Sequence, residues 1–288
     1  MNEENSSVLG RLGGIDVSHH QTQIDWQKVK AGGYEFVFLK ATEGGTYTDP
    51  DFARRRAECH AANLPVGFYH FFRPKGPIQA QIDNFVNVVG RLQPGELRPV
   101  CDLEVAGEWK GIEARAPREG IILQDRIKMV VKWCEAVEAA CGLPPLIYLS
   151  PSFANEILGN APELARWSLW LANYAAVPTV PAPWTSWTFW QYSESGRIDG
   201  IPANDVDLNW FAGTREDLRQ YQVPLLPEPP APPPCKNETI SPMQWLVNAG
   251  IVSLLFSGLC LWPGLDSVSA FAGACALAMT YCIFSSRT

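Results

Sequence analysis

Short apolar runs alternate with helical patterns from residue 14 to residue 150, and this alternation restricts the fold more than any other feature of the chain. The runs cover residues 14–18, 35–42, 65–72, 99–105 and 146–150. Strands that alternate with helices indicate a parallel sheet. Three further strand-like runs, 169–173, 188–192 and 206–210, come next with no helix between them. We therefore expect an α/β fold, a TIM-like barrel with five β/α units followed by three strands.

The fourth run carries two acids toward its C-terminal end. Asp102 and Glu104 stand at positions i and i+2, so a strand directs both to one face, about 6.5–7 Å apart at Cα. Like charges repel, and burial raises the cost of ionising both, so one acid keeps its proton to higher pH. A protonated acid beside an ionised one is suited to cleaving a glycosidic bond. The alternative is an edge strand that carries two solvated acids.

Two more acids lie beside predicted strand ends, and barrel closure brings such ends to one mouth. Asp16 ends the first strand and Asp207 lies in the last, where Asp205 has the same parity and could be mistaken for it. Aromatic and amide side chains near the same mouth suit an N-acetylated sugar, although each also has an ordinary structural explanation. These candidate substrate-binding residues are Tyr69, Tyr148, Trp170, Asn173, Trp190 and Gln191.

Charge and cysteine spacing argue against several other functions. The formal net charge is -7 and no basic run is longer than 54–56, so we expect no nucleic-acid partner. The 8 cysteines form no C-x-x-C pair, which disfavours both a zinc site and a secreted disulfide framework. We expect neither a metal ion nor a cofactor.

Six ordered motifs make residues 14–211 resemble the glycoside hydrolase family 25 lysozymes, the Chalaropsis-type muramidases of bacteria and phages. The motifs are Gly14-Ile15-Asp16-Val17-Ser18 with Gln21, Lys40-Ala41-Thr42-Glu43-Gly44 with Asp49 and Phe52, Gly67-Phe68-Tyr69-His70-Phe71, Asp102-Leu103-Glu104, Trp190-Gln191-Tyr192, and Val206-Asp207-Leu208-Asn209.

The resemblance implies a hydrolase that cleaves the β-1,4 bond between N-acetylmuramic acid and N-acetylglucosamine in peptidoglycan, in cell-wall lysis or remodelling of the endolysin kind. It assigns Glu104 as the general acid and Asp102, Asp16 and Asp207 as the other catalytic acids. Asp102 would steady the oxocarbenium-like charge, or orient the 2-acetamido group if that group is the internal nucleophile; both routes stay open. Two alternatives compete with a muramidase: a catalytically silent carbohydrate-binding barrel tethered to a membrane, and a chitinase-like glycosidase.

Proline-rich residues 224–234 separate the barrel from an apolar tail. We expect an N-terminal arm (1–13), a catalytic barrel (14–222), a linker (223–242) and a two-helix transmembrane hairpin (243–288). Residues 245–262 and 268–284 carry no charged side chain, and each is close to the ~17–25 residues of a membrane helix. A soluble helical hairpin docked on the barrel, or a bundle of several chains, is the alternative.

The sequence also predicts which side of a membrane the barrel occupies. Lys236 and Arg287 flank the apolar segments, which favours a cytoplasmic barrel anchored in the bacterial inner membrane. We see no cleavable signal peptide at the start of the sequence.

Overall fold

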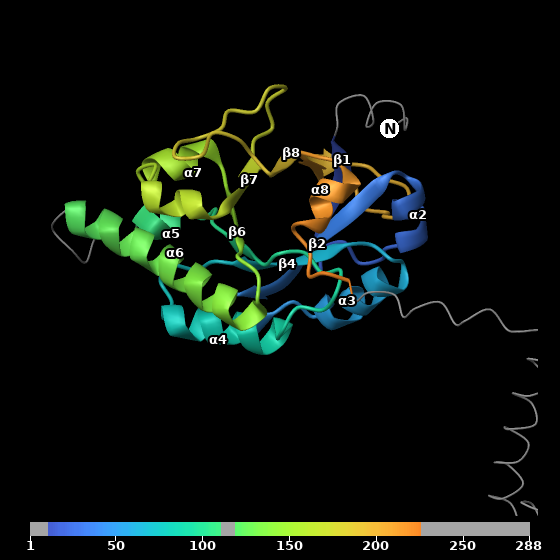
Figure 1. Cartoon of the computed structure of the whole chain (residues 1–288), viewed down its shortest axis with the longest axis horizontal. Coiled ribbons are helices and arrows are strands. Elements are labelled where there is room, and N and C mark those ends of the chain that lie inside the picture. Colours follow the sequence, from blue (N-terminus) through green and yellow to red (C-terminus); the bar gives the residue numbers. More distant parts are fainter. Residues whose placement is uncertain (1–10, 111–118, 226–288) are drawn as a thin grey trace, which may run out of the picture. The chain divides into compact units, whose positions relative to one another are not determined.

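The computed structural model describes residues 11–110 and 119–225, and within them eight strands close into a barrel (Figure 1). Their order around the barrel is β1-β9-β8-β7-β6-β5-β4-β2, and a parallel pairing of β1 with β2 closes it. The strands are β1 (Leu12–Val17), β2 (Tyr34–Glu43), β4 (Val66–Phe71), β5 (Val100–Asp102), β6 (Leu146–Leu149), β7 (Ser168–Ala172), β8 (Phe189–Gly196) and β9 (Val206–Phe211). The short strand β3 (Tyr47–Thr48) adds to the edge of β2.

One strand departs from the parallel sheet that the sequence predicts. β9 runs antiparallel to both β1 and β8, so the barrel is mixed. The connection between β8 and β9 holds no helix, and a short connection joins strands most readily in antiparallel pairing. The reversal brings the beginning of β9 to the mouth where the other strands end.

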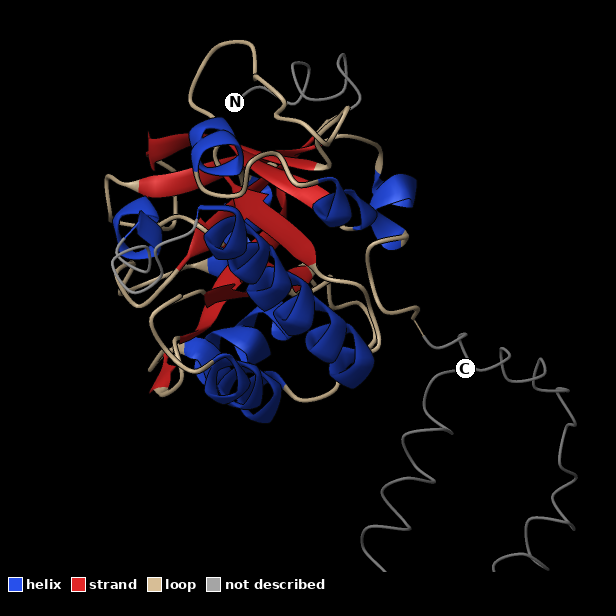
Figure 2. Ribbon diagram, turned by 90° about the vertical axis from the view of Figure 1, so that its left-hand side faces the viewer, coloured by secondary structure: helices blue, strands red, loops and turns tan. Residues whose placement is uncertain are grey.

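A helix follows each of the first five barrel strands, and Figure 2 shows the helices arranged around the strands. The helices are α2 (Trp26–Ala31), α3 (Phe52–Ala61), α4 (Ile78–Val89), α5 (Ala106–Lys110), α6 (Glu119–Cys141), α7 (Pro151–Glu156) and α8 (Arg215–Arg219), with a 3-10 helix η2 (Pro162–Arg166). The sequence does not predict the short elements β3, α5, α8 and η2. Single-turn helices such as α8, which a capping box of Thr214 and Asp217 begins, are too short for an apolar period.

Two apolar layers result from the alternation of side chains along the strands. The Phe38 ring on β2 stacks on Trp170 on β7 at 4.4 Å between centroids, although β2 and β7 are not neighbours in the sheet. These rings therefore meet across the barrel interior, together with Phe36, Phe189 and Phe211. The outer layer packs the other faces of the strands against the helices. Large rings therefore occupy much of the barrel interior.

Several sequence predictions fall on residues outside the described ranges. These are most of the N-terminal arm, the linker from residue 226 onward, and the hairpin at 243–288. Among residues 11–110 and 119–225, no helix has the length and apolar character needed to span a bilayer. The cysteines within these ranges, Cys59, Cys101, Cys134 and Cys141, are free thiols and are buried.

Candidate active site

Four carboxylates converge at the barrel mouth, where three different strands deliver them. Asp16 lies in β1, Asp207 is its register partner in β9, Asp102 is the last residue of β5, and Glu104 comes two residues later. The phenol of Tyr69 on β4 lies near all four: burial raises its pKa, and the negative charges of these acids raise it further. The sequence prediction of a shared mouth is thus what the geometry shows.

The strand with the paired acids is shorter than the sequence predicts. β5 ends at Asp102, so Glu104 belongs to the loop before α5 and not to the strand. Leaving the strand brings the Glu104 side chain into solvent, whereas Asp102 is only 4% exposed. Asp16 is 5% exposed and Asp207 is partly buried. A ligand at the mouth therefore reaches the Glu104 carboxyl most easily.

Asp102 and Glu104 form a pair that shares a proton. Their side chains lie within hydrogen-bonding reach of each other. Burial raises the pKa of Asp102, and the protein around the Glu104 carboxyl removes enough water from it to raise its pKa as well, although the residue is exposed at the mouth. The charge of Glu104 and the hydrogen bond between the two carboxyls raise the pKa of Asp102 further, whereas the same hydrogen bond, Lys40 and Arg73 oppose the increase at Glu104. In the resting site the shared hydrogen bond therefore favours the proton on Asp102. The pair consequently keeps one proton to higher pH than an isolated carboxyl would.

Asp16 and Asp207 form a second pair, in which the two acids have different surroundings. Asp16 Oδ2 accepts hydrogen bonds from Asn209 Nδ2 at 2.7 Å and from Gln191 Nε2 at 3.0 Å. Burial and the charge of Asp16 raise the pKa of Asp207 to about 9. At neutral pH Asp207 therefore carries a proton. Burial raises the pKa of Asp16 as well, but the hydrogen bonds from the two amides and from Asp207 oppose that increase, so Asp16 is the acid of the pair that ionises more readily.

Aromatic donors fix the orientation of both amides. Trp170 Nε1 donates to Asn209 Oδ1 at 2.8 Å, and the Tyr148 hydroxyl donates to Gln191 Oε1 at 2.7 Å. An indole N–H can only donate, so the Asn209 oxygen must face Trp170 and its NH₂ must face Asp16. These contacts make Asp16 a rigidly positioned acceptor.

Two of the predicted sugar contacts, Trp170 and Trp190, lack the exposed ring face that stacking on a sugar requires. Trp170 is 2% exposed in the barrel interior. Trp190 is 4% exposed and belongs to the outer layer, where its Nε1 donates to the Asn173 carbonyl at 2.6 Å. Its sequence neighbours in β8 point inward, and alternation along the strand could have predicted this outcome. Tyr148 is buried beneath the mouth, whereas Tyr69 and Asn173 are partly accessible.

The structure adds charged residues that the sequence reasoning did not assign to the site. Lys40 Nζ pairs with Glu43 Oε2 at 2.6 Å, and Arg73 bridges Glu43 and Glu108. Lys40 shares the inward parity of Phe38 on β2, so strand alternation was the available signal. Lys40 favours the ionised forms of both Asp102 and Glu104, and Arg73 favours that of Glu104.

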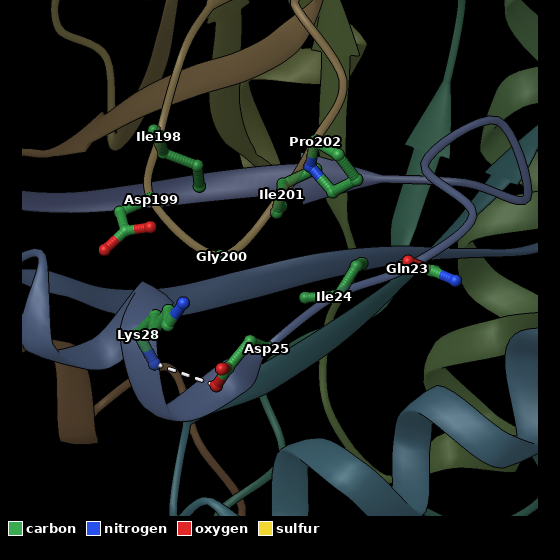
Figure 3. A pocket seen from close by; sticks show the side chains of 9 residues that line it. All are labelled: Gln23, Ile24, Asp25, Lys28, Ile198, Asp199, Gly200, Ile201 and Pro202. Carbon is green, nitrogen blue, oxygen red and sulfur yellow. Dashed lines mark hydrogen bonds between the residues drawn. The ribbon is translucent and has the colours of Figure 1, made fainter.

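A separate hollow lies between the β1–α2 loop and the β8–β9 loop (Figure 3). None of the four carboxylates lines it. Asp25, which lines it, caps α2 by accepting a hydrogen bond from the Lys28 amide, and its own amide donates to the Gly200 carbonyl at 2.8 Å. The second of these bonds ties the two loops together, so the polar groups here stabilise the helix start and the loop junction.

Comparisons with known proteins agree with this geometry. The model of glycosyl hydrolases family 25 matches residues 15–201. Lysozyme M1 of Streptomyces globisporus is 34% identical over 214 residues, which cover 71% of this chain and 69% of that protein. N,O-diacetylmuramidase of Chalaropsis sp is 30% identical over 224 residues, 72% of this chain and 97% of that protein.

Other relatives resemble the chain to a similar degree. The uncharacterized protein YegX of Escherichia coli (strain K12) is 34% identical over 215 residues, 72% of each protein. Among solved structures, the bacterial lysozyme from Streptomyces coelicolor superposes with a TM-score of 0.66 at 32% identity, covering 73% of this chain and 96% of that one.

Proposed function

The chain belongs to glycosyl hydrolase family 25 and is a muramidase that acts on peptidoglycan, and on that premise we propose that Glu104 donates the proton that cleaves the glycosidic bond. The observation that carries this assignment is the contrast in exposure: Glu104 is exposed at the mouth, while its proton-sharing partner Asp102 is buried. A general acid must come within hydrogen-bonding reach of the leaving oxygen, which the exposed carboxyl can do.

Asp102 prepares Glu104 for this step. The hydrogen bond between the two carboxyls favours the proton on Asp102 at rest, so this proton passes along the bond to Glu104 and from Glu104 to the leaving oxygen, which leaves both acids ionised. The bond between the anomeric carbon and the leaving oxygen breaks as this proton arrives, and positive charge develops on the sugar ring. The buried Asp102 carboxylate then lies beneath the mouth as a negative charge that stabilises the oxocarbenium-like transition state, or orients the 2-acetamido group.

Asp16 contributes a second fixed negative charge. Its Oδ2 is held by two amide N–H groups, and its neighbour Asp207 retains a proton at neutral pH. A preorganised carboxylate of this kind interacts with developing positive charge without rearranging at the moment of reaction. We assign the bond that is cleaved as the β-1,4 linkage between N-acetylmuramic acid and N-acetylglucosamine.

The Glu104→Gln variant tests the proposal. The amide keeps the shape of the side chain but has no transferable proton, so we expect a normally folded protein whose rate falls ~10²–10⁴-fold. Glu135→Gln, which makes the same change on the exposed surface of α6, is the matched control and should retain the wild-type rate. Release of reducing ends from purified peptidoglycan and from chitin measures the activity and distinguishes the muramidase from a chitinase-like enzyme. If Glu104→Gln kept more than about a tenth of the rate, the assignment of the acid would be wrong.

A further inference from the structure

Trp170 and Trp190 are too buried to stack on a sugar, so any aromatic stacking at the mouth must involve another ring. Among the described residues, the large apolar side chains with substantial exposure are Tyr47, Tyr174, Val177 and Leu225. Tyr174 is 51% exposed and directly follows Asn173, just after the end of β7 at the mouth. It is thus an accessible aromatic side chain in the part of the barrel where the acids converge.

The position of Tyr174 is fixed by hydrogen bonds. Its hydroxyl donates to Gln191 Oε1 at 3.0 Å, and Gln191 Nε2 donates to Asp16 Oδ2 at 3.0 Å. The neighbouring backbone is also held, because the Asn173 amide donates to the Gln191 carbonyl at 3.1 Å and the Asn173 carbonyl accepts from Trp190. One amide side chain therefore separates the exposed ring from the catalytic carboxylate Asp16.

We propose that Tyr174 is a stacking platform for a sugar ring of the glycan strand, at a subsite on the β7–β8 side of the four carboxylates. The inference rests on the proposed function and adds a binding residue to it. A ring held at its hydroxyl end loses little conformational freedom when a sugar covers its face, which makes such a platform effective. The hydroxyl remains bonded to Gln191 while the apolar face of the ring contacts the sugar.

Kinetics of three variants test the platform. Tyr174→Ala removes the ring, and we expect KM for soluble peptidoglycan strands to rise by about 2- to 12-fold, the factor of one aromatic contact. Tyr174→Phe keeps the ring and loses only the hydroxyl, while Gln191 still accepts from Tyr148, so KM should stay within about two-fold of wild type. Val177→Ala, on the same loop and 79% exposed, is the matched control and should leave KM unchanged.

Binding gives a second readout that does not require turnover. In the Glu104→Gln background, we expect Tyr174→Ala to lower the fraction of protein that sediments with insoluble peptidoglycan. Tyr174→Phe should leave that fraction close to the value for Glu104→Gln alone. The platform is overturned if Tyr174→Ala binds and turns over as Val177→Ala does, or if Tyr174→Phe is as impaired as Tyr174→Ala. Failure of the proposed function looks different, because the wild-type chain itself would then release no reducing ends from peptidoglycan.

Discussion

Asp16 and Asp207 differ in how readily they ionise because their hydrogen-bond partners differ. Burial raises the pKa of Asp16, and two amide N–H groups that donate to it oppose this increase by favouring its ionised form. Asp207 gains no comparable donors and faces the Asp16 charge, so its pKa rises to about 9. Asp207 therefore carries a proton at neutral pH, and Asp16 is the acid of the pair that ionises more readily.

The raised pKa of Asp207 has a consequence for stability. An unfolded aspartate titrates near pH 3.9, so between about pH 4 and 9 the native chain binds a proton that the unfolded chain has released. The free energy of unfolding therefore falls as pH rises through this window, by up to about 1.4 kcal/mol per pH unit for one proton. Asp207→Asn removes this proton from both states and still offers an N–H to Asp16. We expect the variant to gain stability relative to wild type as pH rises from 5 to 8, while its turnover is impaired.

Urea unfolding at several pH values measures this effect. Asp205→Asn is the matched control, because Asp205 is exposed two residues earlier and only its backbone carbonyl is hydrogen-bonded, to Gln21. Its stability should follow the wild-type curve at every pH. Parallel curves for Asp207→Asn and wild type would contradict the titration assigned to Asp207, and impaired turnover in Asp205→Asn alone would move the catalytic role to that residue.

At the residue scale, the sequence predicts the acids better than the aromatic residues around them. The acids occupy strand ends and polar positions that core packing cannot explain, so Asp16 and Asp102 could be found from pattern alone. A tryptophan in an apolar strand suits either a core or a sugar site. Only the packing of Trp170 on Phe38, and the placement of Trp190 in the outer layer, settle which environment each occupies.

At the scale of elements, the direction of β9 is a feature that the alternation of strands and helices does not predict. The pattern predicts where a strand occurs, but the direction of a strand depends on the length and course of its connection. β9 runs opposite to its neighbours, and this reversal puts Asp207 opposite Asp16. The sequence placed Asp207 near the mouth without predicting the reversed direction of the strand that carries it.

The packing of β1 against β2 leads to a prediction at this scale. Gly14 faces the barrel interior, where a Cβ would overlap the Phe36 ring, whereas a Cβ on Gly13 would have its nearest neighbour at 3.5 Å. Gly14→Ala should therefore lower the free energy of unfolding by about 1–3 kcal/mol, the usual cost of overpacking a core. Gly13→Ala is the control one residue away on the opposite face, and it should unfold at nearly the wild-type midpoint. Equal midpoints for the two variants in urea or heat would show that the interior can accommodate the added methyl group.

At the scale of the whole molecule, the closed barrel is built entirely from residues within 11–110 and 119–225. The pairing of β1 with β2 leaves no free barrel edge, so the catalytic unit needs no further strand to complete it. The strand pattern predicted an α/β barrel because eight strand-like runs are visible in the sequence. The antiparallel pairing of β9 with β1 could not be read from that pattern, since strand direction depends on the course of the connection.

We propose that residues 243–288 anchor this barrel in a membrane as a two-helix hairpin. Residues 245–262 and 268–284 are free of charged side chains and long enough to span, and the turn between them carries only Asp266. With Lys236 and Arg287 on the flanks, the positive-inside rule puts both ends, and with them the barrel, in the cytoplasm. That side holds no peptidoglycan, so the enzyme would reach its substrate after the membrane is disrupted or by another way across it.

Carbonate extraction and protease protection of the full chain test the anchor. We expect the full chain to remain in the membrane pellet after carbonate, and a chain ending at Leu225 to be recovered in the supernatant, because only the former carries the apolar segments. In spheroplasts, protease added outside should leave the barrel intact, since the membrane lies between them. Recovery of the full chain in the soluble fraction would show that the hairpin does not anchor the protein in a membrane. Digestion of the barrel from outside would keep the anchor and reverse its topology, which would place the four carboxylates on the peptidoglycan side of the membrane.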